Sequence, residues 1–199
     1  EFIRINHSVP DAVSIALKTP AGVVVDTGDF KIDTTPISGE MIDLTRFGEL
    51  GRQGVLLLMA DSTNAERPGF AMSEQKVGRA LEAQFKGTDK RILVATFASN
   101  VHRVQQIINT AAKFGRKVAV SGRSLDNIVK VTTELGYMDI PPGLLIDINM
   151  VRKYPDDQLC IITTGSQGEP MSALYRMAYG SHRQVEVGPH DKILISASP

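Results

Sequence analysis

The chain has 199 residues, of which 42% are hydrophobic and 22% charged, close to the composition of an average folded domain. This excludes disordered and collagen-like proteins, and we expect one domain, or one and part of another. The longest apolar run, Val55 to Ala60, is far shorter than the ~20 residues that cross a bilayer, so no membrane partner is expected. The single cysteine, Cys160, cannot form an internal disulfide and favours a cytoplasmic location.

The net charge of zero hides an asymmetry along the chain. Residues 1–70 carry six basic and ten acidic side chains, whereas residues 71–199 carry sixteen basic and twelve acidic ones. Between residues 101 and 131, six residues are basic and one, Asp126, is acidic. An acidic first part and a basic remainder suit a metal-binding part beside a polyanion-binding part. Solvated helix faces are the better explanation of the charge runs taken alone.

Residues 1–60 are predicted to form short strands. Residues 2–7 alternate with period two, and Ala21-Gly22 is a hairpin turn between two later strands. Part of this region buries only one face, which is typical of an antiparallel or sandwich sheet. The further strands are predicted over residues 14–18, 23–26 and 55–59.

After residue 70 the pattern changes to strands that alternate with amphipathic helices. Ser73 begins the first helix, which places Val77, Leu81 and Phe85 on one face. Such alternation is typical of parallel βαβ units, so the fold class is α/β. Strands at both ends of the chain indicate a piece of a longer protein. The predicted strands are 91–97, 117–121, 159–163 and 192–197, and the later helices are 101–114, 125–135 and 171–178.

Three predicted strands of the second part end in small polar residues that open a helix or a turn, at residues 97–100, 121–124 and 164–170. In a parallel sheet these turns lie at one edge, where free N–H groups and helix dipoles favour anions. Each turn taken alone is more often a helix cap. Together with the basic residues beside them they favour a phosphate-bearing ligand. None matches a dinucleotide-binding or P-loop motif.

Polar side chains also follow the strands of the first part. His7, Asp29 and Asp61 each come directly after a predicted strand or its turn. Metal and acid–base sites are commonly built at such positions, although each residue taken alone is more often a cap. A divalent metal site needs about three or four protein ligands, which one histidine and one aspartate cannot supply.

Five segments together resemble ribonuclease J, a family of bacterial nucleases in the β-CASP group of the metallo-β-lactamase superfamily. The resemblance covers essentially the whole chain. It implies that residues 1–70 are the later part of a metallo-β-lactamase αββα half-sandwich and that residues 71–199 are most of a parallel-sheet β-CASP domain. The segments are His7–Asp11, Thr27–Lys31, Ala60–Asn64, Ala95–Asn100 and Thr164–Pro170.

The resemblance also implies a hydrolytic site. His7 and Asp29 correspond to zinc ligands, with Asp29 bridging two zinc ions, and Asp61 corresponds to a carboxylate that orients a catalytic histidine. Two zinc ions lower the pKa of water for attack on a phosphodiester near pH 7. No His-x-His-x-Asp-His motif is present, and His182 and His190 do not stand in matching motifs. We therefore expect the parent protein to be active and this chain alone to be inactive.

The implied partner is single-stranded RNA carrying a 5′-monophosphate, cut internally and trimmed from its 5′ end in rRNA processing and mRNA decay. The parent protein is expected to be a homo-oligomer. Phe97 either stacks on a base or belongs to the core, and Gly165 to Glu169 is the predicted loop for the 5′-phosphate. The predicted RNA contacts are Phe97, Ser99, Asn100, His102, Arg103, Arg123, Ser124, Gly165, Ser166, Gly168 and Glu169.

Three other functions remain open at this point. One is an RNA-binding module without catalysis, which predicts salt-dependent binding without cleavage. Another is a β-CASP nuclease that acts on DNA, which a comparison of RNA with DNA of the same sequence would separate. The third is a metallohydrolase of small molecules, against which the basic stretch argues.

Overall fold

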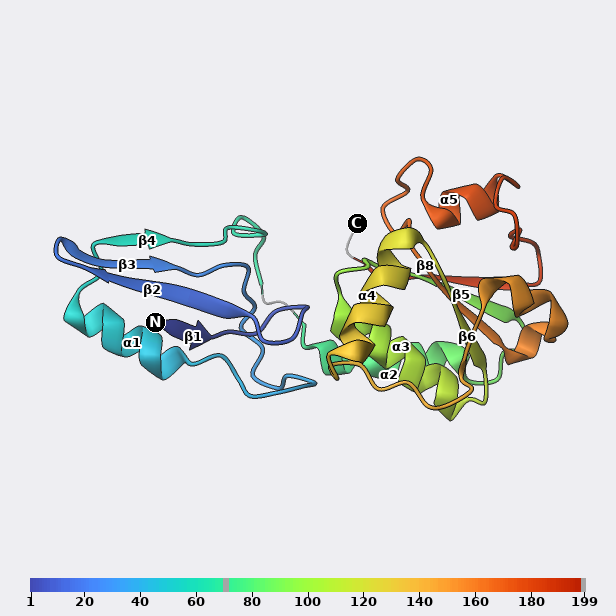
Figure 1. Ribbon diagram of the computed structural model, residues 1–199, viewed down its shortest axis with the longest axis horizontal. Coiled ribbons are helices and arrows are strands. Elements are labelled where there is room, and N and C mark those ends of the chain that lie inside the picture. Colours follow the sequence, from blue (N-terminus) through green and yellow to red (C-terminus); the bar gives the residue numbers. More distant parts are fainter. Residues whose placement is uncertain (70–71, 198–199) are drawn as a thin grey trace. The chain divides into compact units, whose positions relative to one another are not determined.

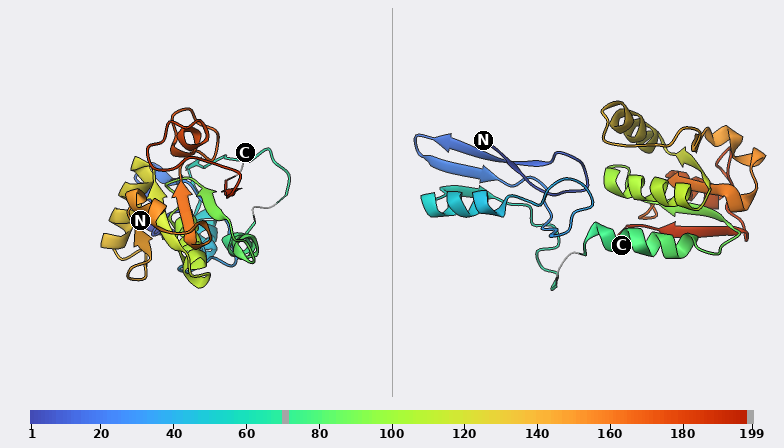
Figure 2. Two further views of the ribbon diagram at one scale, coloured as in Figure 1. Left: turned by 90° about the vertical axis from the view of Figure 1, so that its right-hand side faces the viewer. Right: turned by 90° about the horizontal axis from the view of Figure 1, so that it is seen from below.

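The structure, a computed structural model, describes residues 1–69 and 72–197. It forms two compact units, Glu1–Lys76 and Val77–Pro199, which are described separately below (Figures 1 and 2). The change of pattern in the sequence predicts a boundary after residue 70, whereas the structure divides within the helix that follows. Among the described residues, no helix has both the length and the apolar character needed to span a membrane.

The first unit is a four-stranded sheet with one helix packed on it. Its strand order is β1-β2-β3-β4, in which the first two pairs are antiparallel and β3 and β4 are parallel. Each of these strands is predicted by the sequence, to within a few residues at its ends. The elements are β1 (Phe2–Arg4), β2 (Val13–Thr19), β3 (Gly22–Asp26), α1 (Leu44–Gln53) and β4 (Leu57–Met59).

Helix α1 is not predicted by the sequence. It contains Gly48 and Gly51, and glycine lowers the intrinsic helix propensity. Two interactions offset this cost. The Asp43 carboxylate accepts a hydrogen bond from the N–H of Arg46 at 2.9 Å and so caps the helix. Helix α1 lies along one face of the sheet (Figure 1), and its residue Leu50 packs in a cluster with Ile3, Ala16 and Val25.

The opposite face of this sheet is apolar and exposed. Because side chains alternate along a strand, Ile15 and Leu17 lie on the face opposite Ala16, and Phe2 pairs with Ile15. Phe2, Ile15 and Leu17 are 75%, 38% and 54% exposed. One face packed on a helix and one open apolar face are typical of a single layer of a sandwich. This unit agrees with the expected half-sandwich.

The second unit is built on a five-stranded parallel sheet of order β7-β6-β8-β5-β9, as the alternating pattern predicts. Its central strands are buried on both faces, and α3 and α4 pack side by side (Figure 1). The sequence does not predict the two-residue strand β7 or the short 3₁₀ helices at residues 148–153 and 156–158. The helices and strands after the first unit's sheet are α2 (Glu74–Phe85), β5 (Arg91–Ala95), α3 (Val101–Lys113), β6 (Lys117–Ser121), α4 (Arg123–Glu134), β7 (Leu145–Ile146), β8 (Leu159–Thr163), α5 (Ala173–Ala178) and β9 (Asp191–Ile195).

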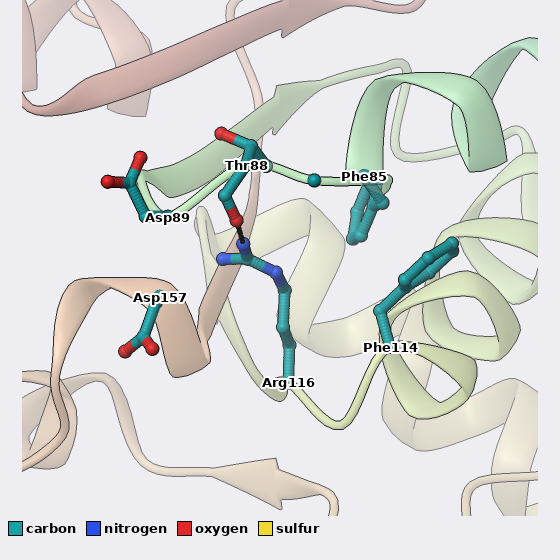
Figure 3. Close-up of a pocket in the computed structure, with 7 residues that line it drawn as sticks. Phe85, Thr88, Asp89, Phe114, Arg116 and Asp157 are labelled. Carbon is teal, nitrogen blue, oxygen red and sulfur yellow. Dashed lines mark hydrogen bonds between the residues drawn. The ribbon is translucent and has the colours of Figure 1, made fainter.

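A buried arginine ties the ends of several of these elements together. Arg116 is only 3% exposed, and its guanidinium lies 6.0 Å from the centroid of the Phe85 ring, beside a cavity of about 340 Å³ (Figure 3). Burial lowers the pKa of this guanidinium. Arg116 belongs to the basic stretch of the sequence, but it points into the protein and not to a partner. It donates to four backbone carbonyls, those of Thr88 (2.6 Å), Lys90 (2.8 Å), Leu159 (3.0 Å) and Asp156 (3.3 Å).

Cys160 lies in the middle of the sheet on β8. It is fully buried, and burial raises the pKa of its thiol to about 12. In the unfolded chain the thiol ionises near pH ~8.5. Above that pH the unfolded state binds fewer protons, so the free energy of unfolding falls by up to ~1.4 kcal/mol per pH unit from this group.

We expect Cys160→Ala to flatten that decline. The measurement is urea unfolding of the wild-type and variant chains at about pH 8 and about pH 9.5, followed by tyrosine fluorescence, because all four tyrosines lie in the second unit. The variant should lose less stability between the two pH values. Equal losses of stability in both proteins would contradict the attribution of this decline to the buried Cys160 thiol. Rapid reaction of the native thiol with a disulfide reagent would contradict it too.

Candidate functional site

Three strands of the first unit run in the same direction and end at the same edge. β1 and β3 are each antiparallel to β2, and β4 is parallel to β3. His7, Asp29 and Asp61 follow β1, β3 and β4, so the topology brings them to one edge. There the Nε2 atom of His7 lies 3.8 Å from the Oδ2 atom of Asp29. A bridge between Asn6 and Lys31 holds the two segments together.

Asp61 is oriented by its neighbours in this edge. Its Oδ1 atom accepts a hydrogen bond from the N–H of Thr63 at 2.8 Å. This bond, the Thr63 hydroxyl, the N–H of Phe30 and the charge of His7 hold the pKa of the Asp61 carboxyl below its usual value. Asp61 is therefore an ionised acceptor in the electrostatic neighbourhood of His7.

The residues at this edge fit part of a zinc site. A histidine nitrogen and an aspartate oxygen are the donor types that zinc takes. Residues 1–69 and 72–197 contain no group of three or more histidine, cysteine, aspartate or glutamate side chains arranged to hold a metal ion. The pair His7 and Asp29 can therefore supply two ligands, and a complete zinc site needs ligands beyond this set.

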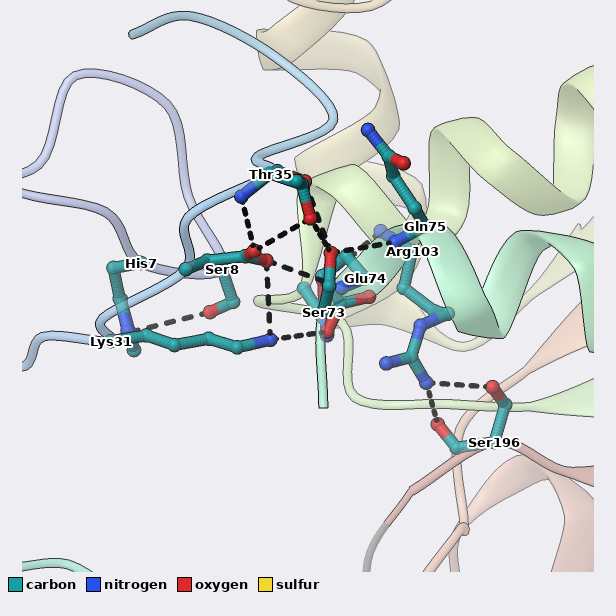
Figure 4. Close-up of polar contacts among 11 residues, drawn as sticks. His7, Ser8, Lys31, Thr35, Ser73, Glu74, Gln75, Arg103 and Ser196 are labelled. Carbon is teal, nitrogen blue, oxygen red and sulfur yellow. Dashed lines mark hydrogen bonds and ion pairs between the residues drawn. The ribbon is translucent and has the colours of Figure 1, made fainter. Parts of the chain in front are cut away.

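A buried carboxylate that the sequence does not reveal lies next to this edge. Asp33 is 6% exposed and accepts hydrogen bonds from the N–H groups of Thr35 (3.0 Å) and Glu74 (3.3 Å). Burial raises the pKa of Asp33, but these bonds outweigh it and the net shift is downward. The Nζ atom of Lys31 lies 3.8 Å from Asp33 and 3.5 Å from Glu74 (Figure 4). This network fixes the loop that follows Asp29.

In the second unit, the three polar turns lie side by side as predicted. β6, β8 and β5 are neighbours in the sheet and run parallel, so residues 122, 164 and 97 follow adjacent strand ends. Gly122 has a φ of 129°, and a Cβ atom there would come within 2.9 Å of the Thr164 side chain. Gly122 thus allows the turn after β6 to pack against the turn after β8.

The predicted RNA contacts differ in how exposed they are and in whether they already bond within the protein. Asn100 caps α3, because its Oδ1 atom accepts the N–H of Arg103 at 3.0 Å. Arg103 itself donates hydrogen bonds to the carbonyl (3.0 Å) and hydroxyl (2.8 Å) of Ser196 (Figure 4). Part of its hydrogen-bonding capacity is therefore already used within the protein. The exposed residues are Phe97, Ser99, Arg123, Ser124, Gly168 and Glu169; His102 is half-buried, and Gly165 and Ser166 are buried.

Two buried polar atoms at this edge lack a hydrogen-bond partner among the residues that the structure describes. They are the Oγ atom of Ser166, which follows β8, and the Nε atom of Arg176 on α5. Native proteins leave few buried polar groups unsatisfied. Arg176 is not among the predicted contacts, because nothing in its sequence context distinguishes it from a surface arginine on a short helix.

Comparison with known proteins identifies the family. The family model described as "Ribonuclease J, beta-CASP domain" matches residues 89–199. The chain belongs to the ribonuclease J family. It is 46% identical over 197 residues to Ribonuclease J of Helicobacter pylori (strain ATCC 700392 / 26695), covering 99% of this chain and 29% of that protein.

Two further relatives show the same coverage. Ribonuclease J of Synechocystis is 47% identical and Ribonuclease J2 of Bacillus subtilis is 42% identical, each over the full chain and over 31% and 36% of the relative. The chain thus spans about a third of the length of the curated relatives it matches. A solved structure described as a protein of unknown function from Enterococcus faecalis V583 has a TM-score of 0.56 at 15% identity, covering 97% of this chain and 52% of that one. This likeness concerns the fold alone.

Proposed function

We propose that the chain is part of a metal-dependent ribonuclease that acts on single-stranded RNA. The observation that carries the proposal is the approach of His7 and Asp29 to 3.8 Å at a strand edge that also holds the ionised Asp61. Membership of the ribonuclease J family supports it. We further propose zinc as the metal, with two ions in the whole protein, and both internal and 5′-terminal cleavage of RNA by a homo-oligomer in the cytoplasm.

The site residues of the first unit have separate roles in this proposal. His7 and Asp29 would hold zinc, together with ligands supplied by the rest of the protein. When bound, zinc makes water acidic enough to act as a nucleophile near neutral pH and polarises the phosphodiester. Asp61 accepts hydrogen bonds as an anion and would orient a histidine that protonates the leaving oxygen. The network around Asp33 holds the loop after Asp29 in place.

The second unit supplies the RNA-binding edge in this proposal. Arg123 and Ser124 are exposed at the start of α4, where an arginine can neutralise a backbone phosphate. Phe97 is 37% exposed, which leaves part of its ring able to stack on a base. Such stacking contributes ~1–3 kcal/mol per base. The proposed place of the 5′-monophosphate is the Gly165–Glu169 loop, where the hydroxyl of Ser166 has no hydrogen-bond partner within the described part of the chain.

Binding of this chain to short RNA tests the second part of the proposal. We expect salt-sensitive binding of a single-stranded oligonucleotide with a 5′-monophosphate, weaker binding of the 5′-hydroxyl form, and no cleavage. Arg123→Gln should reduce the affinity about three- to tenfold and make the salt dependence shallower, because one phosphate contact is lost.

Arg79→Gln is the matched control, since Arg79 is an exposed arginine on α2. It should leave the affinity within about twofold of wild type. Equal effects of the two substitutions would contradict a defined RNA-binding edge at the β6 turn. Tighter binding of DNA than of RNA with the same sequence would favour the DNA-directed alternative.

A further inference from the structure

A cavity of about 480 Å³ in the second unit is lined by β6, α4 and the segment that leads into β7. Its volume lies within the range of ~300–1,000 Å³ that small-molecule sites occupy in proteins. Most of its lining is apolar, as in such sites. The apolar residues are Val120 on β6, Val129 on α4, and Ile140, Pro141, Pro142 and Leu145 on the segment before and at the start of β7.

Hydrogen bonds hold the segment that leads into β7 at both of its ends. The N–H group of Asp139 donates to the Gln105 side chain on α3 (2.9 Å), and the same side chain donates to the Asp139 carbonyl (2.8 Å). Closer to β7, the Nζ atom of Lys117 donates to the carbonyl of Gly143 (2.8 Å). The two consecutive prolines between these ends have φ angles fixed by their rings. A ligand therefore need not order this wall, which favours binding.

Part of the apolar lining is open to solvent. Leu145 is 40% exposed. Val120 is 8% exposed, whereas Val118 and Ala119, which precede it on β6, are fully buried. Covering apolar surface removes it from water and is favourable. An occupant of this cavity should therefore have an apolar body.

One carboxylate of the lining has no partner within residues 1–69 and 72–197. Asp126 accepts no hydrogen bond and forms no ion pair there. The ammonium group of Lys130 does not neutralise it, because its Nζ atom lies 4.0 Å from the Oε1 atom of Glu134. Desolvation and the negative charge of Asp147 both raise the pKa of the Asp126 carboxyl. A cation beside Asp126 would offset these costs, whereas an anion would add to them.

We propose that this cavity binds an organic cation with an apolar body, whose ammonium group pairs with Asp126 and whose hydrocarbon part lies against Val120, Val129 and Leu145. Hydrophobic burial holds the body, and the ion pair selects the sign of the charge. The lining does not include Arg123 or Ser124. The site is thus separate from these two proposed RNA contacts, and the inference does not rest on the proposed function.

Titration of the 199-residue chain with phenethylamine, followed by the NMR shifts of its backbone amides, tests the proposal. Phenethyl alcohol and phenylacetate have a similar hydrocarbon body with a neutral or an anionic head group. We expect the amine to bind about three- to tenfold more tightly than the alcohol and more than tenfold more tightly than phenylacetate. The shifts should include the amides of Val120, Val129 and Leu145. Equal affinities for the three compounds would overturn the inference.

Asp126→Asn tests the role of the carboxylate. It should weaken binding of the amine about three- to tenfold and leave the affinity for the alcohol within about twofold, so that the preference for the amine is lost. The free energy of unfolding in urea should stay unchanged or rise, because the charge of Asp126 is disfavoured in the folded chain. Asp139→Asn is the matched control, since Asp139 is exposed on the same wall segment and does not line the cavity.

Two outcomes of this experiment would contradict the proposal. One is a preference for the amine that Asp126→Asn retains, or that Asp139→Asn abolishes equally. The other is a shift of the same amides with protein concentration alone, which would assign the cavity to contact with a second copy of the chain.

Discussion

Replacing Arg116 by methionine is expected to destabilise the second unit by about 3–5 kcal/mol. Four backbone carbonyls, those of Thr88, Lys90, Asp156 and Leu159, lose their donor together. Each buried acceptor left without a partner costs about 1–3 kcal/mol, and the four costs overlap because they share one site. Urea unfolding followed by tyrosine fluorescence measures this loss.

Two further variants distinguish the hydrogen bonds of Arg116 from its charge. Arg116→Lys keeps a positive charge but has one compact ammonium group, which cannot reach all four carbonyls in the fork geometry of a guanidinium. We expect it to recover less than half of the lost stability. Arg79→Met removes an exposed arginine and should change the free energy of unfolding by less than about 0.5 kcal/mol. A loss at Arg116 as small as that at Arg79 would show that the four bonds do not stabilise the unit.

The second large effect concerns catalysis in a full-length family protein that carries this segment. Asp29→Asn is expected to lower kcat on single-stranded RNA by about 10³-fold or more, because the metal loses an anionic ligand. RNA affinity should stay within about threefold, since the substituted residue lies in the first unit and outside the proposed RNA edge. Steady-state kinetics and metal content measured on the same sample test both parts.

Glu66→Gln is the matched control for Asp29→Asn. It removes one exposed carboxylate from the same unit, and kcat should change less than about twofold. Asp29→Asn protein that kept its zinc and a kcat within tenfold of wild type would rule out Asp29 as a ligand. A parallel loss of RNA affinity would instead indicate a general disturbance of the fold.

The sequence predicts most of the fold because the strands of the second unit are continuous apolar runs. The bounds of α2, β6 and β8 agree with their predicted ranges. Helix α1 could not be predicted because its stability comes from a cap and from packing on the sheet, and its two glycines oppose the helix locally. Strand β7 has two residues, too few for a periodic signal.

The candidate sites were predictable to the level of the sheet edge and no further. Residues after parallel strands must share an edge, which brings together the three turns of the second unit. Which side chains at that edge are already paired depends on contacts between distant segments. Arg103 donates a hydrogen bond to Ser196, whereas the buried Nε atom of Arg176, an ordinary arginine in the sequence, has no hydrogen-bond partner among the described residues.

The position of β5 inside its sheet has a consequence for the folding of the nascent chain. Ile92 on β5 pairs with Cys160 on one side and with Lys192 on the other, about 70 and 100 residues later in the chain. At a synthesis rate of ~5–20 residues per second, β5 waits several seconds for each neighbour. During that time a strand with four consecutive apolar residues, Ile92–Ala95, has both edges free, which is the condition for pairing with another chain. Until both neighbours have been made, β5 is therefore the interior strand of this unit that is most open to pairing with another chain.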